Sequence, residues 1–307
     1  MSGPQNQLGG EIPPPPVRPP SGPSAGPSAT RYILIAVVST VVVFALLAYL
    51  IVNAPGWERV KASFFDWDEF IESAPGIVAA FRLNIALFLT AEVLILVFGL
   101  VLAVLRGLPG PVFFPVRLLA TIYVDVFRAL PGLLVIFVLG FAIPGLRLPG
   151  VPTEPFVWAV VALTLLYSAY VSEVYRAGID SVHPSQAAAA RSLGLSQLQA
   201  LRYVVVPQAV RRVIPPLLND FIGLQKDTVL VSAIGLVEIF RQTQLRLQAT
   251  FNFTPFLVTA LVFLVVTIPL ARFTDWLVSR ERDRRYAAAV SARAAAARRG
   301  RLWGFGR

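Results

Sequence analysis

Long apolar runs alternate with short polar segments along most of this chain. Residues 32–52 contain no charged side chain and would form a helix of about 30 Å, which is the thickness of a bilayer core. Five more apolar stretches follow, at about 83–105, 118–144, 156–175, 210–240 and 255–278. The pattern predicts an all-α membrane protein with about six transmembrane helices.

Several of these stretches are interrupted. The third contains Asp125, Arg128 and Pro131, and the fifth contains Pro215-Pro216 and Lys226-Asp227. Proline removes a helix hydrogen bond, so we expect breaks or kinks at these points. The segments at 53–80 and 176–207 are too polar to span, and we expect 53–80 to be a net acidic connection on the extracytoplasmic side.

Both ends of the chain differ from the middle. Residues 1–31 are rich in Pro, Gly and Ser, which predicts a disordered tail, and residues 280–307 form an arginine-rich tail. The apolar run at 32–52 begins too far along the chain for a typical signal peptide, so we interpret it as a retained span. A late-starting, cleaved signal sequence is the alternative interpretation.

Composition supports the membrane assignment. The 307 residues are 56% hydrophobic and only 14% charged. The absence of cysteine excludes disulfides, thiolate metal sites and a catalytic thiol, and the single histidine, His183, is expected to be an ordinary loop residue. No metal site is predicted.

The net charge of +10 is better explained by the orientation of the chain in the membrane than by nucleic-acid binding. No nucleic-acid partner is therefore expected. With six spans, the tails and loops lie alternately on the two sides of the membrane and so form two sets. The more basic set holds both tails and the loops with Arg31, Arg106, Arg117, Arg176, Arg191, Arg202, Arg211 and Arg212. The positive-inside rule therefore places both termini in the cytoplasm.

The polar interruption at about 183–207 predicts two short helices. Residues 186–193 are alanine-rich and end at Gly194, the residue type best suited to a left-handed C-cap. Ser196 is a good N-cap for a second helix over about 197–206, and Pro207 would mark the entry to the next span. A small-residue helix on the cytoplasmic face suits the groove of another protein, although a surface loop without a partner gives the same pattern.

This segment resembles the conserved cytoplasmic "EAA" loop of binding-protein-dependent ABC permeases. The matching spacings are those of Ala189, Ala190, Gly194, Val204, Val206 and Pro207, whereas Ala188 stands where the family has Glu. In that family the loop seats in the nucleotide-binding subunit. The resemblance therefore implies an ATPase-coupling role for Gln186, Ala188, Ala189, Ala190, Gly194, Leu195, Pro207 and Gln208.

The resemblance extends over about residues 81–279 and narrows to polar amino-acid permeases. It is carried by Tyr170-Val-Ser-Glu173-Val-Tyr-Arg176, Pro207-Gln208-Ala209, Lys226-Asp227-Thr228 and, in part, Arg128-Ala129-Leu130-Pro131. It implies a type I importer permease with a five-helix core and one extra N-terminal span at 32–52. It also implies a cytoplasmic ATPase dimer, a second permease subunit that is identical or a paralogue, and an extracytoplasmic solute-binding protein.

Charged groups at membrane depth are costly and usually face a cavity or the bundle interior. Candidates for a translocation path are Glu92, Asp125, Arg128, Asn219, Lys226, Asp227 and Thr228. Internal ion pairing, for instance of Asp125 with Arg128, or proximity to the headgroups would explain the same residues.

Together these features predict a multi-pass permease of the bacterial plasma membrane that imports polar amino acids by ATP-driven alternating access. The chain has no phosphate-binding G-x-x-x-x-G-K-[ST] loop. We therefore expect that it is not an enzyme and that ATP and Mg²⁺ bind to the partner ATPase. The alternatives are an ABC permease for another small solute and an ion-coupled secondary transporter, although no internal repeat supports the latter. An intramembrane aspartyl protease using Asp125 and Asp220 has no further support.

Overall fold

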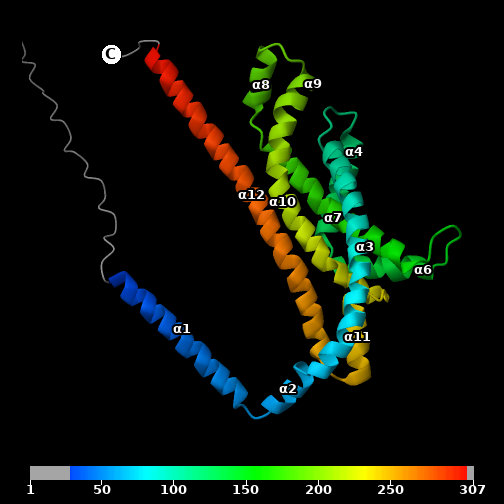
Figure 1. Ribbon diagram of the computed structural model, residues 1–307. Coiled ribbons are helices and arrows are strands. Elements are labelled where there is room, and N and C mark those ends of the chain that lie inside the picture. The colour runs from blue at the N-terminus through cyan, green and yellow to red at the C-terminus, as the bar shows by residue number, and fades with distance from the viewer. Residues whose placement is uncertain (1–27, 303–307) are drawn as a thin grey trace, which may run out of the picture. The chain divides into compact units, whose positions relative to one another are not determined.

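The computed structural model describes the backbone of residues 28–302, and the side chains of residues 31–280 and of Ser291. All regular secondary structure in this part of the chain is helical, as predicted (Figure 1). Most of the predicted N-terminal disordered tail at 1–31, and residues 303–307 of the basic tail, lie outside the described residues. The chain divides into two compact units, Met1–Arg59 and Val60–Arg307.

The first unit contains α1 (Ser28–Val52), which lies where the sequence predicts the N-terminal span. Its part from Arg31 to Val52 is long and apolar enough to cross a membrane, and its side chains are exposed. The Asn53 side chain donates to the carbonyl of Tyr49 and closes the last turn.

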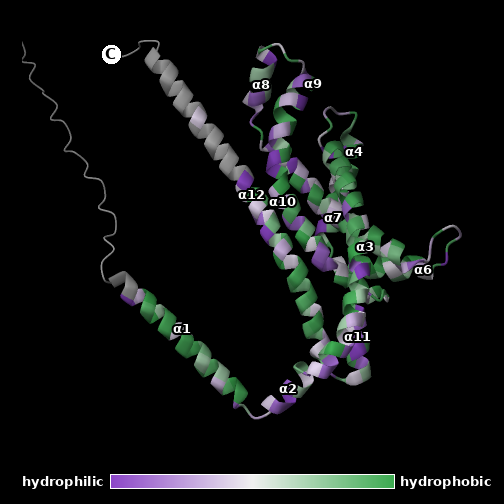
Figure 2. Ribbon diagram, viewed as in Figure 1, coloured by the Kyte–Doolittle hydropathy of each residue, from purple (hydrophilic) through white to green (hydrophobic). Residues whose placement is uncertain are grey.

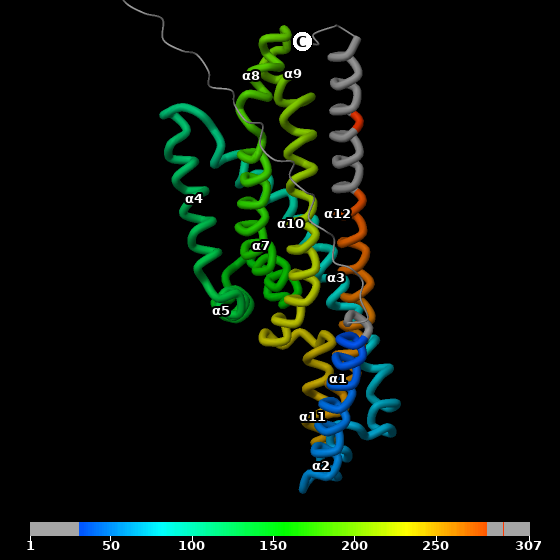
Figure 3. Tube along the Cα trace, turned by 90° about the vertical axis from the view of Figure 1, so that its left-hand side faces the viewer, coloured from blue at the N-terminus to red at the C-terminus, as the bar shows by residue number. Residues whose placement is uncertain are grey.

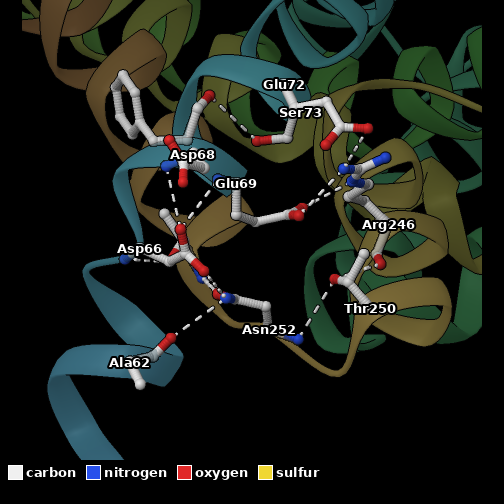
Figure 4. A network of polar contacts seen from close by, with 11 residues as sticks. Ala62, Asp66, Asp68, Glu69, Glu72, Ser73, Arg246, Thr250 and Asn252 are labelled. Carbon is white, nitrogen blue, oxygen red and sulfur yellow. Dashed lines mark hydrogen bonds and ion pairs between the residues drawn. The ribbon is translucent and has the colours of Figure 1, made fainter. Parts of the chain in front are cut away.

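The region predicted as a polar connection is helical. Helix α2 (Trp57–Phe64) crosses the boundary between the units, and α3 runs without interruption from Trp67 to Arg106. The Asp66 carboxylate accepts from the N–H groups of Asp68 and Glu69 and so caps α3. Arg246 holds the first turns of α3 in place, with its Nε 2.6 Å from Glu69 and its Nη2 2.9 Å from Glu72 (Figure 4).

A sharp bend separates α4 (Phe114–Ala129) from the helical segment that follows, which comprises α5 (Gly132–Phe137), a π-helical turn (Val138–Ala142) and α6 (Ile143–Gly145). The two parts meet at 105°. The bend follows from Pro131, because the residue before a proline is driven out of the helical region, and Leu130 has the extended angles φ −78° and ψ 138°. This break is confirmed.

The second half of unit 2 begins with α7 (Pro155–Asp180), α8 (Pro184–Ser192) and α9 (Gln197–Ala200). A π-helical turn (Leu201–Val205) joins α9 directly to α10 (Val206–Asp227), and a 3-10 helix (Thr228–Ile234) follows. The described residues end with α11 (Ile239–Thr250) and α12 (Thr254–Leu302), the latter passing through Pro269.

Four helices in the described part of the chain are long and apolar enough to span a membrane, and the bent α4–α6 pair makes five. The predicted segment at 210–240 differs from the expectation. It is not one apolar span, because α10 carries Arg211, Arg212, Asp220 and Lys226 along its length and the helix changes type at Thr228. Pro215 and Pro216 lie inside α10 without breaking it.

The core of unit 2 forms where α7 packs between α3, α4 and α10 (Figure 3). Gly99 lets α3 approach α7 closely, since a Cβ there would lie 2.7 Å from Cγ1 of Val171. Figure 2 shows apolar positions along α1 and most of α3, whereas α11 is mainly polar. Helices α8 and α9 lie at one end of this unit, and α11 with the start of α3 lies at the other (Figures 1 and 3).

Candidate functional site

The first candidate site is the hairpin formed by α8 and α9. Helix α8 begins at Pro184, and the ring of His183 accepts from the N–H of Ser185. It ends in a Schellman motif: the N–H of Gly194 donates to the carbonyl of Arg191 at 2.9 Å, and that of Leu195 to the carbonyl of Ala190 at 3.2 Å. Gly194 has φ +91°, so the left-handed C-cap expected from the sequence is present.

Helix α9 runs into α10 without the break that the sequence predicts at Pro207. Ser196 and Gln199 form a reciprocal capping box at the start of α9, which confirms the N-cap predicted at Ser196. Pro207 does not separate two helices. It has no N–H to donate, and the π-helical turn at 201–205 accommodates it while the helix continues. The Gln208 side chain donates to the carbonyl of Val204 at 3.0 Å within this irregular stretch.

The exposed surface of the hairpin is partly apolar. Gln186, Ala188 and Ala189 are exposed, whereas Ala190 is buried. Leu193 and Leu198 are 82% and 73% exposed. Large apolar side chains held at the turn of a capped hairpin are suited to contact another protein. Neither leucine was predicted from the sequence, because a lone leucine in a polar loop gives no periodic signal.

The second candidate site is a cavity of about 300 Å³ between α7, α10 and the bend after α4. The hydroxyl of Tyr167 donates to Oδ2 of Asp227 at 2.7 Å. Gly223 lies close by, since a Cβ there would lie 3.4 Å from that hydroxyl. The lining residues are Leu130, Gly132, Leu163, Leu166, Tyr167, Tyr170, Asn219, Asp220, Gly223, Asp227 and Leu230.

The charged side chains that line this cavity are both acidic. They are Asp220 and Asp227, and Oδ2 of Asp220 is buried without a hydrogen-bond partner. Glu92 of α3 is half-buried and lies within electrostatic range of Asp220. The cavity therefore favours a ligand that brings positive charge and hydrogen-bond donors.

The structure brings together some of the predicted path residues and separates others. Asn219 and Asp227 line the cavity. Asp125 and Lys226 are exposed. Thr228 is fully buried, and its hydroxyl accepts from Nδ2 of Asn84 at 3.0 Å, which places it in the packing of α3.

Arg128 takes part in an ion-pair cluster that was not predicted from the sequence. Its guanidinium lies 6.0 Å from the ring centroid of Tyr170 and its Nη1 lies 3.6 Å from Oε1 of Glu173. The same oxygen lies 2.5 Å from Nη1 of Arg106, whose side chain is only 6% exposed. The one feature of the sequence that could have indicated this cluster is Glu173, a carboxylate in an otherwise apolar stretch. In the described residues, no group of His, Cys, Asp and Glu is arranged to hold a metal ion.

Comparisons with known proteins cover most of unit 2. Residues 97–283 match the family described as "binding-protein-dependent transport system inner membrane component". The probable glutamine ABC transporter permease protein GlnM of Bacillus subtilis (strain 168) is 39% identical over 187 residues, which are 60% of this chain and 83% of that protein. The glutamate/aspartate import permease protein GltK of Escherichia coli O157:H7 is 34% identical over 182 residues, 58% of this chain and 80% of that protein.

A solved structure gives the same result for the fold. The crystal structure of an amino acid ABC transporter with histidines aligns with a TM-score of 0.64 and 30% sequence identity. The alignment covers 70% of this chain and 98% of the other. The family match at residues 97–283 includes the bent α4–α6 segment, the α8–α9 hairpin and the residues that line the cavity.

Proposed function

Because this chain belongs to the family of binding-protein-dependent transport system inner membrane components, we propose that it is the permease subunit of an ABC importer for polar amino acids in the bacterial plasma membrane. The observation that carries the proposal is the α8–α9 hairpin, whose Schellman and capping-box termini hold Leu193 and Leu198 out from the chain. The names of the relatives, which include glutamine and glutamate/aspartate permeases, support the amino-acid cargo.

In the proposed mechanism, the hairpin seats in a groove of a separate ATPase subunit, which binds ATP and Mg²⁺. Closure of the ATPase dimer would move the hairpins of two permease subunits together and open the cavity toward a loaded binding protein outside. Hydrolysis would reset the helices and expose the cavity to the cytoplasm. Helix α9 continues through the π-helical turn into α10. A movement of the hairpin would therefore be transmitted along this continuous helix to Asn219 and Asp227 in the cavity.

The uptake test is ATP-dependent transport in proteoliposomes that contain the permease, its ATPase and the binding protein. We expect uptake to stop when internal ATP is depleted and to persist when an uncoupler removes the ion gradients. The opposite result would favour an ion-coupled secondary transporter.

Replacing Gly194 by valine is expected to uncouple the complex. A β-branched residue at φ +91° is strained, so the Schellman end of α8 would be lost and the hairpin displaced. We expect uptake and stimulated ATP hydrolysis to fall at least about tenfold while membrane insertion is unchanged.

The matched control is Gly110→Val. Gly110 also has a positive φ, of +89°, and open space around it, but it lies in the loop between α3 and α4. Normal coupling in this control with lost coupling in Gly194→Val supports the role of the hairpin. Normal uptake in Gly194→Val would contradict it.

The acidic lining leads to a prediction about the cargo. Lysine and arginine are expected to stimulate ATP hydrolysis by the complex with binding protein more than glutamate does, since a second carboxylate would face Asp220 and Asp227. Asp220→Asn should narrow this preference, whereas Asp125→Asn, at an exposed site on α4, should leave it unchanged. Stronger stimulation by glutamate would contradict the assignment of the cavity.

A further inference from the structure

The cavity between α7 and α10 continues into a second hollow that lies toward the α8–α9 hairpin. This crevice of about 400 Å³ is lined by Glu173, Val174, Ala177 and Ser181 of α7 and by Arg212 and Pro216 of α10. Tyr170 of the cavity is followed on the same face of α7 by Val174 and Ala177 of the crevice. The cavity and the crevice are therefore successive parts of one groove between α7 and α10, which lie side by side (Figure 3).

Arg128 lies where the cavity gives way to the crevice. Its guanidinium carbon is 6.0 Å from the ring centroid of Tyr170, which lines the cavity. Its Nη1 is 3.6 Å from Oε1 of Glu173, which lines the crevice. Because Arg128 belongs to α4, a side chain of a third helix contacts the wall of the groove at the boundary between its two parts.

The two arginines that share Glu173 are held differently. Arg106 lies 2.5 Å from Oε1 of Glu173 and its side chain is 6% exposed. Arg128 is farther from the same oxygen, and its side chain is 45% exposed. Release of Arg128 therefore leaves Glu173 paired with Arg106, and an exposed ion pair of this kind contributes little to stability. The contact of Arg128 can be broken and remade while that of Arg106 persists.

The bend after α4 provides a hinge for Arg128. Arg128 lies in the last turn of α4, directly before the break at Leu130 and Pro131. Leu130 and Gly132 line the cavity, and the helical parts on either side of the break meet at 105°. Hinges are commonly such terminal residues of an element. A rotation at Leu130 would move Arg128 away from α7 and widen the groove beside the cavity.

We propose that Arg128 is the cytoplasmic gate of the cavity. Its contacts with Tyr170 and Glu173 close the groove between the cavity and the crevice, and their release lets the amino acid pass toward the hairpin. The inference rests on the proposed function, which places the hairpin in the cytoplasm. Arg128 is a positioning residue in this role, because it acts by holding α4 against α7.

A permanent brace between α4 and α7 fits these observations less well. That role is already filled by Tyr123 of α4, whose hydroxyl donates to the carbonyl of Leu165 at 2.9 Å and lies 2.9 Å from Oγ of Ser168. Val124 of α4 is also fully buried in the cluster that contains Ala169 of α7. Arg128 adds a second cation to a carboxylate that already has a buried partner, and it is half-exposed.

A single thiol in the cavity tests the gate. The chain contains no cysteine, and a Cβ at Gly132 would lie 3.5 Å from Cδ1 of Leu166, an ordinary contact. Gly132→Cys is therefore combined with each Arg128 variant in inside-out vesicles without ATP, which expose the hairpin side to impermeant methanethiosulfonates. We expect a cationic and an anionic reagent both to react about tenfold faster in Arg128→Gln, and within about twofold of the Arg128 parent in Arg128→Lys.

The two reagents separate opening of the groove from a change in its charge. Loss of a positive charge alone would speed the cationic reagent and slow the anionic one. The matched control is Arg176→Gln. Arg176 is also 45% exposed and lies 3.7 Å from its partner Asp180, but both belong to α7, so no contact between helices is lost. This control should leave the two reaction rates unchanged.

A second measurement uses the cysteine-free protein, reconstituted with its ATPase and binding protein. The amount of amino acid taken up per ATP hydrolysed is expected to fall at least about fivefold in Arg128→Gln and to recover in Arg128→Lys. The melting temperature of Arg128→Gln should match that of Arg176→Gln, because Arg106 keeps Glu173 paired.

Three results would overturn the inference. They are unchanged thiol reactivity in Arg128→Gln, opposite changes for the two reagents, and a lowered melting temperature with an unchanged ratio of uptake to hydrolysis. The last would indicate a permanent brace. If the wild-type complex shows no ATP-dependent uptake, the proposed function fails instead.

Discussion

Replacing Gly178 by alanine is expected to force α7 and α10 apart beside the α8–α9 hairpin. A Cβ at this position would lie 2.0 Å from Cγ1 of Val213 and 3.4 Å from the carbonyl oxygen of Ala209. Val213 is only 6% exposed and is branched at Cβ, so it has no room to turn away. Overpacking of this kind costs about 1–3 kcal/mol. Thermal unfolding of the purified chain in detergent, followed by its tryptophan fluorescence, measures the loss.

The control and the rescue make this test specific. Gly76→Ala also places a methyl group on a helical glycine, but its nearest neighbour would be Nε2 of Gln242 at 3.5 Å, an ordinary contact. That variant should be stabilised by up to about 1 kcal/mol, since alanine is the better helix former. Val213→Ala combined with Gly178→Ala should recover most of the lost stability. Failure of this rescue would show that the crossing of α7 and α10 is not the cause.

The features that could be predicted from the sequence are those set by local interactions. The α8–α9 hairpin was predicted well because its signals are local: alanine-rich helix, Gly194 at a left-handed C-cap, and Ser196 at an N-cap. The bend at Pro131 was predicted for the same reason, since proline restricts the residue directly before it. Hydropathy likewise located α1, α3, α7 and α12, because apolar runs report burial or lipid without reference to a partner.

What the sequence did not show depends on residues far apart in the chain. Asn84 donates to Oε2 of Glu238 at 2.9 Å across 154 positions, and both side chains are buried. The carboxylate of Glu238 also accepts from the N–H groups of Phe240 and Arg241. This network explains why Thr228, expected on a translocation path, is packed instead against Asn84. A window along the sequence gives no signal for such a contact.

The ion-pair cluster of Glu173 gives the largest expected effect. Glu173→Gln keeps the shape of the side chain but removes the one carboxylate that contacts Arg106 and Arg128. Arg106 would then be a buried cation without a counter-charge, and its Nε already has no hydrogen-bond partner. Breaking a fully buried pair on one side costs about 3–5 kcal/mol. The side chain of Glu173 is 33% exposed, so solvent screens part of this pair and we expect a loss of about 3 kcal/mol. The partner that dominates is Arg106, because the side chain of Arg128 is 45% exposed.

Two further variants test whether this cost comes from the unpaired charge. Asp180→Asn breaks the exposed pair with Arg176, whose atoms lie 3.7 Å apart, and should cost no more than about 0.5 kcal/mol. Replacing both partners, as in Arg106→Met with Glu173→Leu, removes the buried charge along with its counter-charge and should be less damaging than Glu173→Gln alone. Unfolding in detergent at neutral pH measures all three. Equal losses for Glu173→Gln and Asp180→Asn would mean that the cluster is solvated and holds α3, α4 and α7 together no more strongly than a surface pair.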